Sequence, residues 1–129
     1  MFFEIPLSGI LECPFGIFET KKIFHYKNQK IEEKKYTKWM DYDKIKGSPC
    51  VRTRKQGDYL VVNSAGGRKK LNRIFIDEKI PAGLRDQIPV VAAGSEILWI
   101  PGGRMNEQYK ITSTTGRVLE LHYQGGVLT

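Results

Sequence analysis

The sequence has few of the residues that build catalytic and metal centres. Its 129 residues include two cysteines and two histidines, and neither pair has the Cys-x-x-Cys or His-Glu-x-x-His spacing that predicts a zinc site. His25 and His122 each stand in aromatic-rich sequence, which is typical of structural or exposed histidines. The isolated thiols of Cys13 and Cys50 are typical of a reducing compartment, where cysteine packs as a small apolar residue.

Long apolar segments are also missing. No run approaches the roughly 18 residues that would span a bilayer, and the first three residues are followed at once by Glu4 and Pro6, unlike a signal peptide. The sequence also lacks a Gly-x-x-x-x-Gly-Lys-Ser/Thr loop for nucleotides. These absences predict a cytoplasmic chain without membrane contact, without a metal site and without a cofactor of its own.

Positive charge is what the sequence has in excess. Its 21 basic and 14 acidic side chains give a net charge of +7, and a pI near 9.5 favours anionic partners. Between Lys44 and Arg85, eleven basic residues face three acidic ones, an excess of eight within one segment. Charge this concentrated beside a Gly66-Gly67 turn predicts binding of a polyanion. The alternative is that the basic residues only keep the protein soluble.

Short strands dominate the predicted secondary structure, because β-branched and aromatic residues recur between Gly and Pro breaks. A polar segment, 27–38, predicts a solvated loop, and the Gly-Ser-Pro break at 47–49 divides an N-terminal β portion, 1–46, from residues 47–129. Outside the first 26 residues, strands are predicted at 39–42, 51–54, 59–62, 89–93, 96–100, 109–112 and 118–123. The predicted fold class is α+β, with a β-sandwich-like core of mostly antiparallel strands in a single domain, 1–129.

One main helix, 68–79, is predicted after the Gly-Gly loop, and a short one at 82–87. Leu71, Ile74 and Phe75 form a core-facing stripe. Lys69, Lys70 and Arg73 lie away from this stripe at the start of the helix. Loop N–H groups, the positive helix end and cationic side chains together suit a phosphate. Cations at this end are unfavourable for the helix itself, so they favour a bound anion.

Two other functions compete with anion binding. Asp58 and Asp77 predict a magnesium-dependent nuclease if they share a metal, but Asp58 is typical of a turn and Asp77 stands four residues after Arg73, where it predicts an ion pair. A protein-interaction module or homodimer is the second alternative. Its surface would be formed by four aromatic side chains: Phe2, Phe3, Phe15 and Phe18.

A series of short motifs resembles the C-terminal part of bacterial tRNA-isoleucine lysidine synthetases. The motifs are Trp39-Met40-Asp41-Tyr42-Asp43-Lys44, Arg52-Thr53-Arg54-x-x-Gly57-Asp58, Gly67-Arg68-Lys69-Lys70-Leu71, Phe75-Ile76-Asp77-x-Lys79-Ile80-Pro81, Arg85-Asp86, and Leu98-Trp99-x-Pro101-Gly102 with Arg104. Their order and spacing make the resemblance specific from residue 39 to about 109. It is weaker over the first 38 residues.

The resemblance implies a tRNA-binding function. Members of this family use ATP and magnesium to attach lysine to the wobble cytidine of an isoleucine tRNA, and their catalytic Ser-Gly-Gly-x-Asp-Ser loop is absent here. The chain is therefore expected to be a non-catalytic C-terminal domain that grips tRNA beside an N-terminal catalytic domain of the same polypeptide. The expected RNA contacts are Arg52, Arg54, Gly66, Gly67, Arg68, Lys69, Lys70, Arg73 and Arg104.

The expected mode of recognition is contact with the phosphate backbone and the shape of a structured RNA. Lys and Arg neutralise phosphates and release counterions. Phe75 belongs to the helix stripe and Trp99 to an apolar strand, so neither predicts base stacking.

Overall fold

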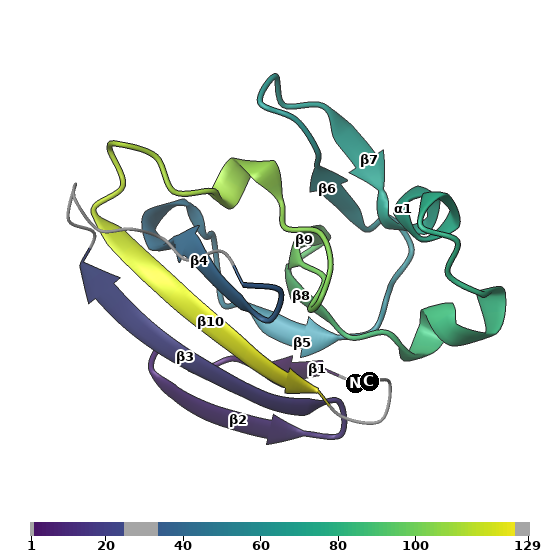
Figure 1. The fold of residues 1–129 in the computed structure, drawn as a ribbon, viewed down its shortest axis with the longest axis horizontal. Coiled ribbons are helices and arrows are strands. Elements are labelled where there is room, and N and C mark those ends of the chain that lie inside the picture. The colour runs from purple at the N-terminus through teal and green to yellow at the C-terminus, as the bar shows by residue number, and fades with distance from the viewer. Residues whose placement is uncertain (1, 25–33, 126–129) are drawn as a thin grey trace.

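Two β-sheets and a helical layer make up the computed structural model, which describes residues 2–24 and 34–125 (Figure 1). The six-stranded sheet contains, in spatial order, β1 (Phe2–Glu4), β5 (Cys50–Arg52), β8 (Val90–Ala93), β9 (Glu96–Trp99), β6 (Tyr59–Val61) and β7 (Arg68–Lys70). The four-stranded sheet contains β2 (Gly9–Cys13), β3 (Gly16–Phe24), β10 (Arg117–Gly125) and β4 (Thr37–Asp41). Among these described strands, β6 and β9 pair in parallel and the other neighbours are antiparallel.

The helical elements are short. They are α1 (Leu71–Asp77) and the 3-10 turns η1 (Tyr42–Lys44), η2 (Ala82–Gln87) and η3 (Glu107–Tyr109). The α+β fold class and both predicted helices are confirmed, although the main helix begins at Leu71 rather than at residue 68. The strand predicted at 109–112 is wrong, because the Asn106 side chain accepts a hydrogen bond from the Gln108 N–H and turns the chain into η3.

A first hydrophobic core lies between the two sheets. Phe18 and Leu121 contribute from the four-stranded sheet, and Val91 and Trp99 from the six-stranded sheet; all four are buried. Strand residues alternate between the two faces of a sheet, so β8 places Val91 in this core and its neighbours on the opposite face. The arrangement is that of a β-sandwich.

A second core covers that opposite face. Val90 and Ala92 of β8 pack there with Leu71, Ile74 and Phe75 of α1, so the predicted apolar stripe of the helix is confirmed. A helix of seven residues is not stable alone in water. Burial of each large apolar side chain contributes about 1.5–3 kcal/mol, and this packing fixes α1 beside the edge strand β7.

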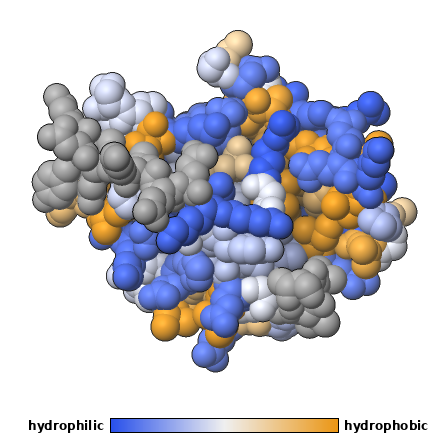
Figure 2. Space-filling view, viewed as in Figure 1, coloured by the Kyte–Doolittle hydropathy of each residue, from blue (hydrophilic) through white to orange (hydrophobic). Residues whose placement is uncertain are grey.

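The predicted polar loop at 27–38 can be compared with the structure only in part. Residues 27–33 lie outside the described residues, while Thr37 and Lys38 already belong to β4. Within the described ranges, the structure has no helix long and apolar enough to cross a membrane. Figure 2 shows a surface that is largely hydrophilic, with apolar side chains gathered where α1 and η2 lie.

Candidate nucleic-acid interface

The basic run at 68–70 lies on the edge strand β7, not in a helix. Tyr59 pairs with Lys70 and Leu60 with Lys69 across the β6–β7 hairpin. Because cross-strand partners share a face, Lys69 lies on the side of Leu60 and α1, whereas Arg68 and Lys70 lie on the opposite side. The hairpin therefore divides the three predicted contacts between two faces of one exposed edge.

The Gly-Gly loop does not present the free N–H groups that were predicted for a phosphate cradle. The side-chain oxygen of Asn63 accepts hydrogen bonds from the N–H groups of Ala65 (3.1 Å) and Gly67 (2.9 Å). The Gly66 N–H donates to the Asn63 carbonyl. Gly66 has a φ of 85° and provides the left-handed turn of the hairpin. The loop shapes the hairpin, and its N–H groups are used internally.

The start of α1 is also occupied. The Leu71 N–H donates to the Asp58 carbonyl at 2.9 Å. The chain enters α1 from the strand β7 rather than from the Gly-Gly loop, so the predicted combination of that loop with the helix start does not form. The part of the prediction that remains is the set of cationic side chains near β7 and α1.

Two of those side chains form ion pairs with one carboxylate. Lys69 and Arg73 both form ion pairs with Asp77, and the Arg73 Nε lies 3.2 Å from its Oδ1. The hydrogen bond from Lys69 lowers the pKa of Asp77 below its ordinary value of 3.8, and the nearby charges of Lys69, Arg73 and Arg104 act in the same direction. The predicted Arg73–Asp77 pair is confirmed. Asp77 thus holds cations from β7 and α1 beside one another.

The other predicted cations lie on the opposite face of the hairpin and beside α1. The Arg68 guanidinium lies 4.5 Å from the centroid of the Tyr59 ring, a distance at which a cation is attracted to an aromatic face. Lys70 is exposed. Arg54 donates to Asp86 at 2.7 Å and to Asn72 at 2.9 Å, which places its guanidinium between η2 and α1.

Arg52 does not face outward with the others, and the prediction that it does is wrong. Its side chain is 3% exposed and forms two hydrogen bonds of 2.8 Å with the carboxylate of Asp58. It also donates to the carbonyls of Thr53 and Gly94. The hydrogen bond with Asp58 raises the pKa of Arg52. Arg52 is a buried junction between β5, the 53–58 loop and the β8–β9 turn.

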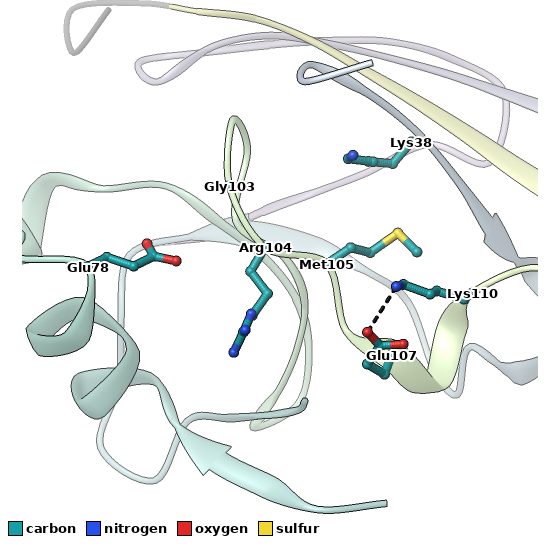
Figure 3. A pocket seen from close by; sticks show the side chains of 7 residues that line it. All are labelled: Lys38, Glu78, Gly103, Arg104, Met105, Glu107 and Lys110. Carbon is teal, nitrogen blue, oxygen red and sulfur yellow. Dashed lines mark hydrogen bonds and ion pairs between the residues drawn. The ribbon is translucent and has the colours of Figure 1, made fainter. Parts of the chain in front are cut away.

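A cleft of about 340 Å³ opens beside Arg104 (Figure 3). Figure 3 shows Lys38 and Glu78 reaching into it from opposite sides, while the Arg104 side chain points away from Lys38. Lys110 is held at 2.9 Å by Glu107. The residues that line the cleft are Lys38, Glu78, Gly103, Arg104, Met105, Glu107 and Lys110. Sequence reasoning found Arg104 but missed Lys38, whose place on β4 was assigned to a loop.

The described residues do not assemble a catalytic or metal centre from the candidates in the sequence. Asp58 is taken up by Arg52, and Asp77 by Lys69 and Arg73, so the nuclease prediction has no shared carboxylate site. Within the described part of the chain, no group of three or more His, Cys, Asp or Glu could hold a metal ion.

The remaining nucleophile and base candidates have structural surroundings. His122 is hydrogen-bonded through its Nδ1 to the Thr37 hydroxyl at 2.7 Å, and His25 lies outside the described residues. Burial raises the pKa of the Cys50 thiol from 9.0, which favours its unreactive, protonated form.

The aromatic surface predicted for a protein partner is reduced. Phe18 is fully buried, and Phe15 is half-buried with an edge-on contact to Phe3 at 6.2 Å. Phe2 is 57% exposed on the edge strand β1. Phe18 is therefore removed from the proposed surface because its ring fills the core between the sheets. A homodimer stays a prediction.

Fold and site together define a class: an α+β sandwich domain whose cationic side chains gather along one sheet edge and the adjoining cleft. The chain belongs to the family described as the TilS substrate C-terminal domain, whose model matches residues 50–121. This membership confirms the family resemblance of the motifs.

Relatives with a longer chain carry a more specific name. The chain is 49% identical over 88 residues to a tRNA(Ile)-lysidine synthase of Caldanaerobacter subterraneus subsp. tengcongensis, which covers 68% of this chain and 19% of that protein. It is 32% identical over 126 residues to the tRNA(Ile)-lysidine synthase of Clostridioides difficile, covering 95% of this chain and 26% of that protein. The chain thus spans about a fifth to a quarter of the length of these two relatives.

A solved structure has the same fold. It is described as a crystal structure of the TILS C-terminal domain, and it superposes with a TM-score of 0.78 at 31% identity. The match covers 97% of this chain and 96% of the other. The similarity extends beyond residues 50–121 to nearly the whole chain.

Proposed function

We propose that this chain is the tRNA-binding domain of a tRNA-isoleucine lysidine synthetase-like ligase, and that it positions the tRNA without taking part in the chemistry. The observation that carries the proposal is the pair of cations, Lys69 and Arg73, that Asp77 holds beside the exposed edge strand β7. The names of the relatives supply the substrate class, since they are tRNA(Ile)-lysidine synthases.

The contacts proposed for the RNA are cations on one edge of the fold. Phosphates are neutralised by exposed Lys and Arg side chains, largely without regard to base sequence. Arg52 is left out because it is buried. The N–H groups of Gly66 and Gly67 are left out because they bond within their loop. The proposed contacts are Arg54, Arg68, Lys69, Lys70, Arg73 and Arg104.

Asp77 has a positioning function in this proposal. A carboxylate between cations lowers the total attraction for a phosphate, but it holds two flexible side chains in one place. Lysine and arginine side chains lose conformational entropy when they are fixed, and an ion pair formed before binding reduces that loss on contact with RNA. The proposed site is a pre-arranged cationic edge.

The chemistry is assigned to a different domain of the ligase. ATP and magnesium would be handled in the cytoplasm by the catalytic domain that the resemblance implies, and the present residues would hold the tRNA against it. This division is supported by the ion pairs of Asp58 and Asp77, which pair with different basic residues and form no shared carboxylate site.

A salt titration of RNA binding tests the proposal. The 129-residue chain is mixed with an unmodified isoleucine tRNA transcript, and the dissociation constant is measured by filter binding over a series of salt concentrations. The logarithm of the affinity should fall linearly with the logarithm of the salt concentration. The variant with both Lys69→Gln and Lys70→Gln should lower this slope by about 1.4–1.8, at roughly 0.7–0.9 for each phosphate that is no longer neutralised.

The matched control is Lys21→Gln. Lys21 is exposed on β3 and pairs across the four-stranded sheet with Glu120, so it removes the same charge from another part of the surface. It should leave the slope close to that of the wild type. Absence of tRNA binding at low salt, or equal slopes for the control and the double variant, would overturn the proposal.

A further inference from the structure

An apolar groove of about 220 Å³ adjoins the basic cleft, and the proposed RNA contacts do not use it. Glu78 and Gly103 line both spaces, which places the groove and the cleft side by side. Its apolar lining includes Tyr36, Phe75, Ile80, Ile100, Pro101 and Tyr123. Phe75, Ile100 and Tyr123 are buried, and Tyr36 is partly exposed beside them. An apolar space with a few polar groups nearby is characteristic of ligand sites.

Tyr36 is held at one side of this groove by several contacts. Its carbonyl accepts a hydrogen bond from the Tyr123 N–H at 2.9 Å, and the two rings lie 6.2 Å apart. The ring also lies against Gly102, where a β-carbon would come within 2.9 Å of its Cε1. The side chain is nevertheless 37% exposed. A fixed, partly exposed aromatic ring is the kind of platform on which an RNA base stacks.

Glu78 adds a hydrogen-bond acceptor at the junction between groove and cleft. Figure 3 shows its carboxylate directed into the cleft, across from Lys38. An acidic side chain is unfavourable for a phosphate, whereas it accepts a hydrogen bond from the exocyclic amino group of a base. Adenine, cytosine and guanine carry such a group and uracil does not.

We propose that the groove takes one unstacked nucleobase of the bound RNA, stacked on Tyr36, with the Glu78 carboxylate accepting a hydrogen bond from the exocyclic amino group of that base. The cations Lys38 and Arg104 of the adjoining cleft then meet the phosphates on either side of the nucleotide. This inference rests on the proposed function and adds to it a base-reading site. Phosphate contacts position an RNA, whereas base contacts distinguish one base from another.

The charge of the neighbourhood favours a nucleotide over a segment of protein. Arg104 and Lys38 line the cleft that lies beside the apolar groove, and their positive charge complements an aromatic base attached to an anionic backbone. A hydrophobic protein segment would gain from the groove but would leave these cations without a partner. Docking of protein at this site is therefore the competing outcome of the experiment.

The experiment compares two RNA hairpins with the same paired stem. One is blunt, and the other has a single unpaired adenosine at its 3′ end, which can enter the groove without bending the stem. The hairpin with the adenosine should bind the wild-type chain about 5- to 140-fold more tightly, the equivalent of the 1–3 kcal/mol that base–aromatic stacking contributes. Replacing the adenosine by uridine should remove part of this gain.

Variants assign the gain to the groove. Tyr36→Ala should abolish the preference for the unpaired adenosine while the salt slope for the blunt hairpin stays unchanged, and Tyr36→Phe should keep the preference. Glu78→Gln should reduce the discrimination between adenosine and uridine. Tyr42→Ala is the matched control, because the Tyr42 ring has cations over it, Lys22 and Arg117, as the Tyr36 ring has Lys35, but Tyr42 lines a different cleft.

The outcomes separate this inference from the proposed function. Salt-dependent binding of both hairpins with equal affinity would overturn the base site and leave the tRNA-binding function standing. A preference for adenosine that persists in Tyr36→Ala would also overturn it, provided that urea unfolding shows the variant to be folded. If neither hairpin and no tRNA binds in low salt, both proposals fail.

A direct probe of stacking uses 2-aminopurine as the unpaired nucleotide. Its fluorescence should fall when the wild-type chain binds and should stay high with Tyr36→Ala. Unchanged fluorescence with the wild type at saturating protein would count against stacking in the groove, because a base that stays in solvent is not quenched by the ring.

Discussion

Replacing Arg52 by methionine should destabilise the fold far more than the same substitution at Arg54, two residues away. The Arg52 and Asp58 side chains are 3% and 2% exposed, and they are joined by two hydrogen bonds of 2.8 Å. Arg54 is 26% exposed, and its ion-pair partner Asp86 is 76% exposed. The two arginines have the same chemistry in opposite surroundings, which makes them a matched pair.

The size of the effect follows from what each substitution leaves behind. Arg52→Met leaves the Asp58 carboxylate buried with the Lys55 N–H, 2.7 Å away, as a remaining donor. It also takes a donor from the Thr53 and Gly94 carbonyls. Removing one partner of a buried ion pair costs about 3–5 kcal/mol, equivalent to about 10–20 °C in melting temperature for a chain of this size. Arg54→Met should cost about 0–1 kcal/mol.

Urea unfolding followed by tryptophan fluorescence measures both values. The slope of the free energy against urea should be the same for the two variants, because the surface exposed on unfolding hardly changes. The double variant with Arg52→Met and Asp58→Leu should recover part of the loss, since an apolar pair of similar volume can replace a buried ion pair.

The two substitutions should rank in the opposite order when RNA binding is measured instead of stability. At a temperature where both variants are folded, Arg54→Met should lower the salt slope by up to about 0.9, and Arg52→Met should leave it unchanged. A difference in stability of less than about 1 kcal/mol between the two variants would refute the anchoring function of Arg52. A lower salt slope for folded Arg52→Met would refute its exclusion from the RNA contacts.

Two further predictions concern residues around the cleft. The hydrogen bond from Lys69 lowers the pKa of Asp77, so the contribution of ionised Asp77 to stability is present above the ordinary value of 3.8 and is lost as the pH falls through the lower value in the folded state. The difference in unfolding free energy between wild type and Asp77→Asn should therefore be constant near neutral pH and shrink below pH 3.8. A constant difference down to the acid limit would contradict the ion pair. Gly102→Ala should destabilise the fold by about 1–3 kcal/mol, because φ is 80° and the new β-carbon would meet the Tyr36 ring. The control Gly66→Ala, with a φ of 85° and open space around the new β-carbon, should cost less. Equal melting temperatures for the two variants would contradict the packing of Gly102 against Tyr36.

The parts of the fold that the sequence predicts well are those set by local patterns. The stripe of Leu71, Ile74 and Phe75 predicts a helix that packs on the sheet, and the structure buries all three. The hairpin of β8 and β9 turns at Gly94, whose φ of 63° favours glycine. In both cases the residues that make the pattern also make the contacts, so the pattern is sufficient.

The errors arise where a partner elsewhere in the chain decides the structure. Arg68, Lys69 and Lys70 have good helix propensity, but pairing with β6 makes them a strand, because tertiary context outweighs a weak local preference. Arg52 was predicted as an RNA contact from the local excess of positive charge. An isolated arginine is costly to bury. Asp58 removes that cost, and its place in a turn gave no sign of the pairing.

The candidate site could be predicted as a composition but not as an arrangement. Excess charge between residues 44 and 85 indicated a cationic surface, and six of the predicted side chains lie on it. The ion pair between Lys69 and Asp77 joins β7 to α1, and the sequence has no local signal for it. Tyr36 was assigned to a polar loop. Its packing against Gly102 joins positions that are far apart in the chain, so no local pattern predicts it.

The position of β10 has a consequence for how the molecule folds. This late strand lies between β3 and β4, and the Tyr123 hydroxyl donates to the Phe15 carbonyl, 108 positions earlier. During synthesis, β2 and β3 leave the ribosome long before the strand that completes their sheet, so one edge of β3 waits unpaired. Contacts of such high sequence separation slow folding, and an unpaired edge invites pairing with other chains. The interval before β10 emerges is therefore the period in which the nascent domain is most exposed to aggregation, and chaperones that cover strand edges would act then.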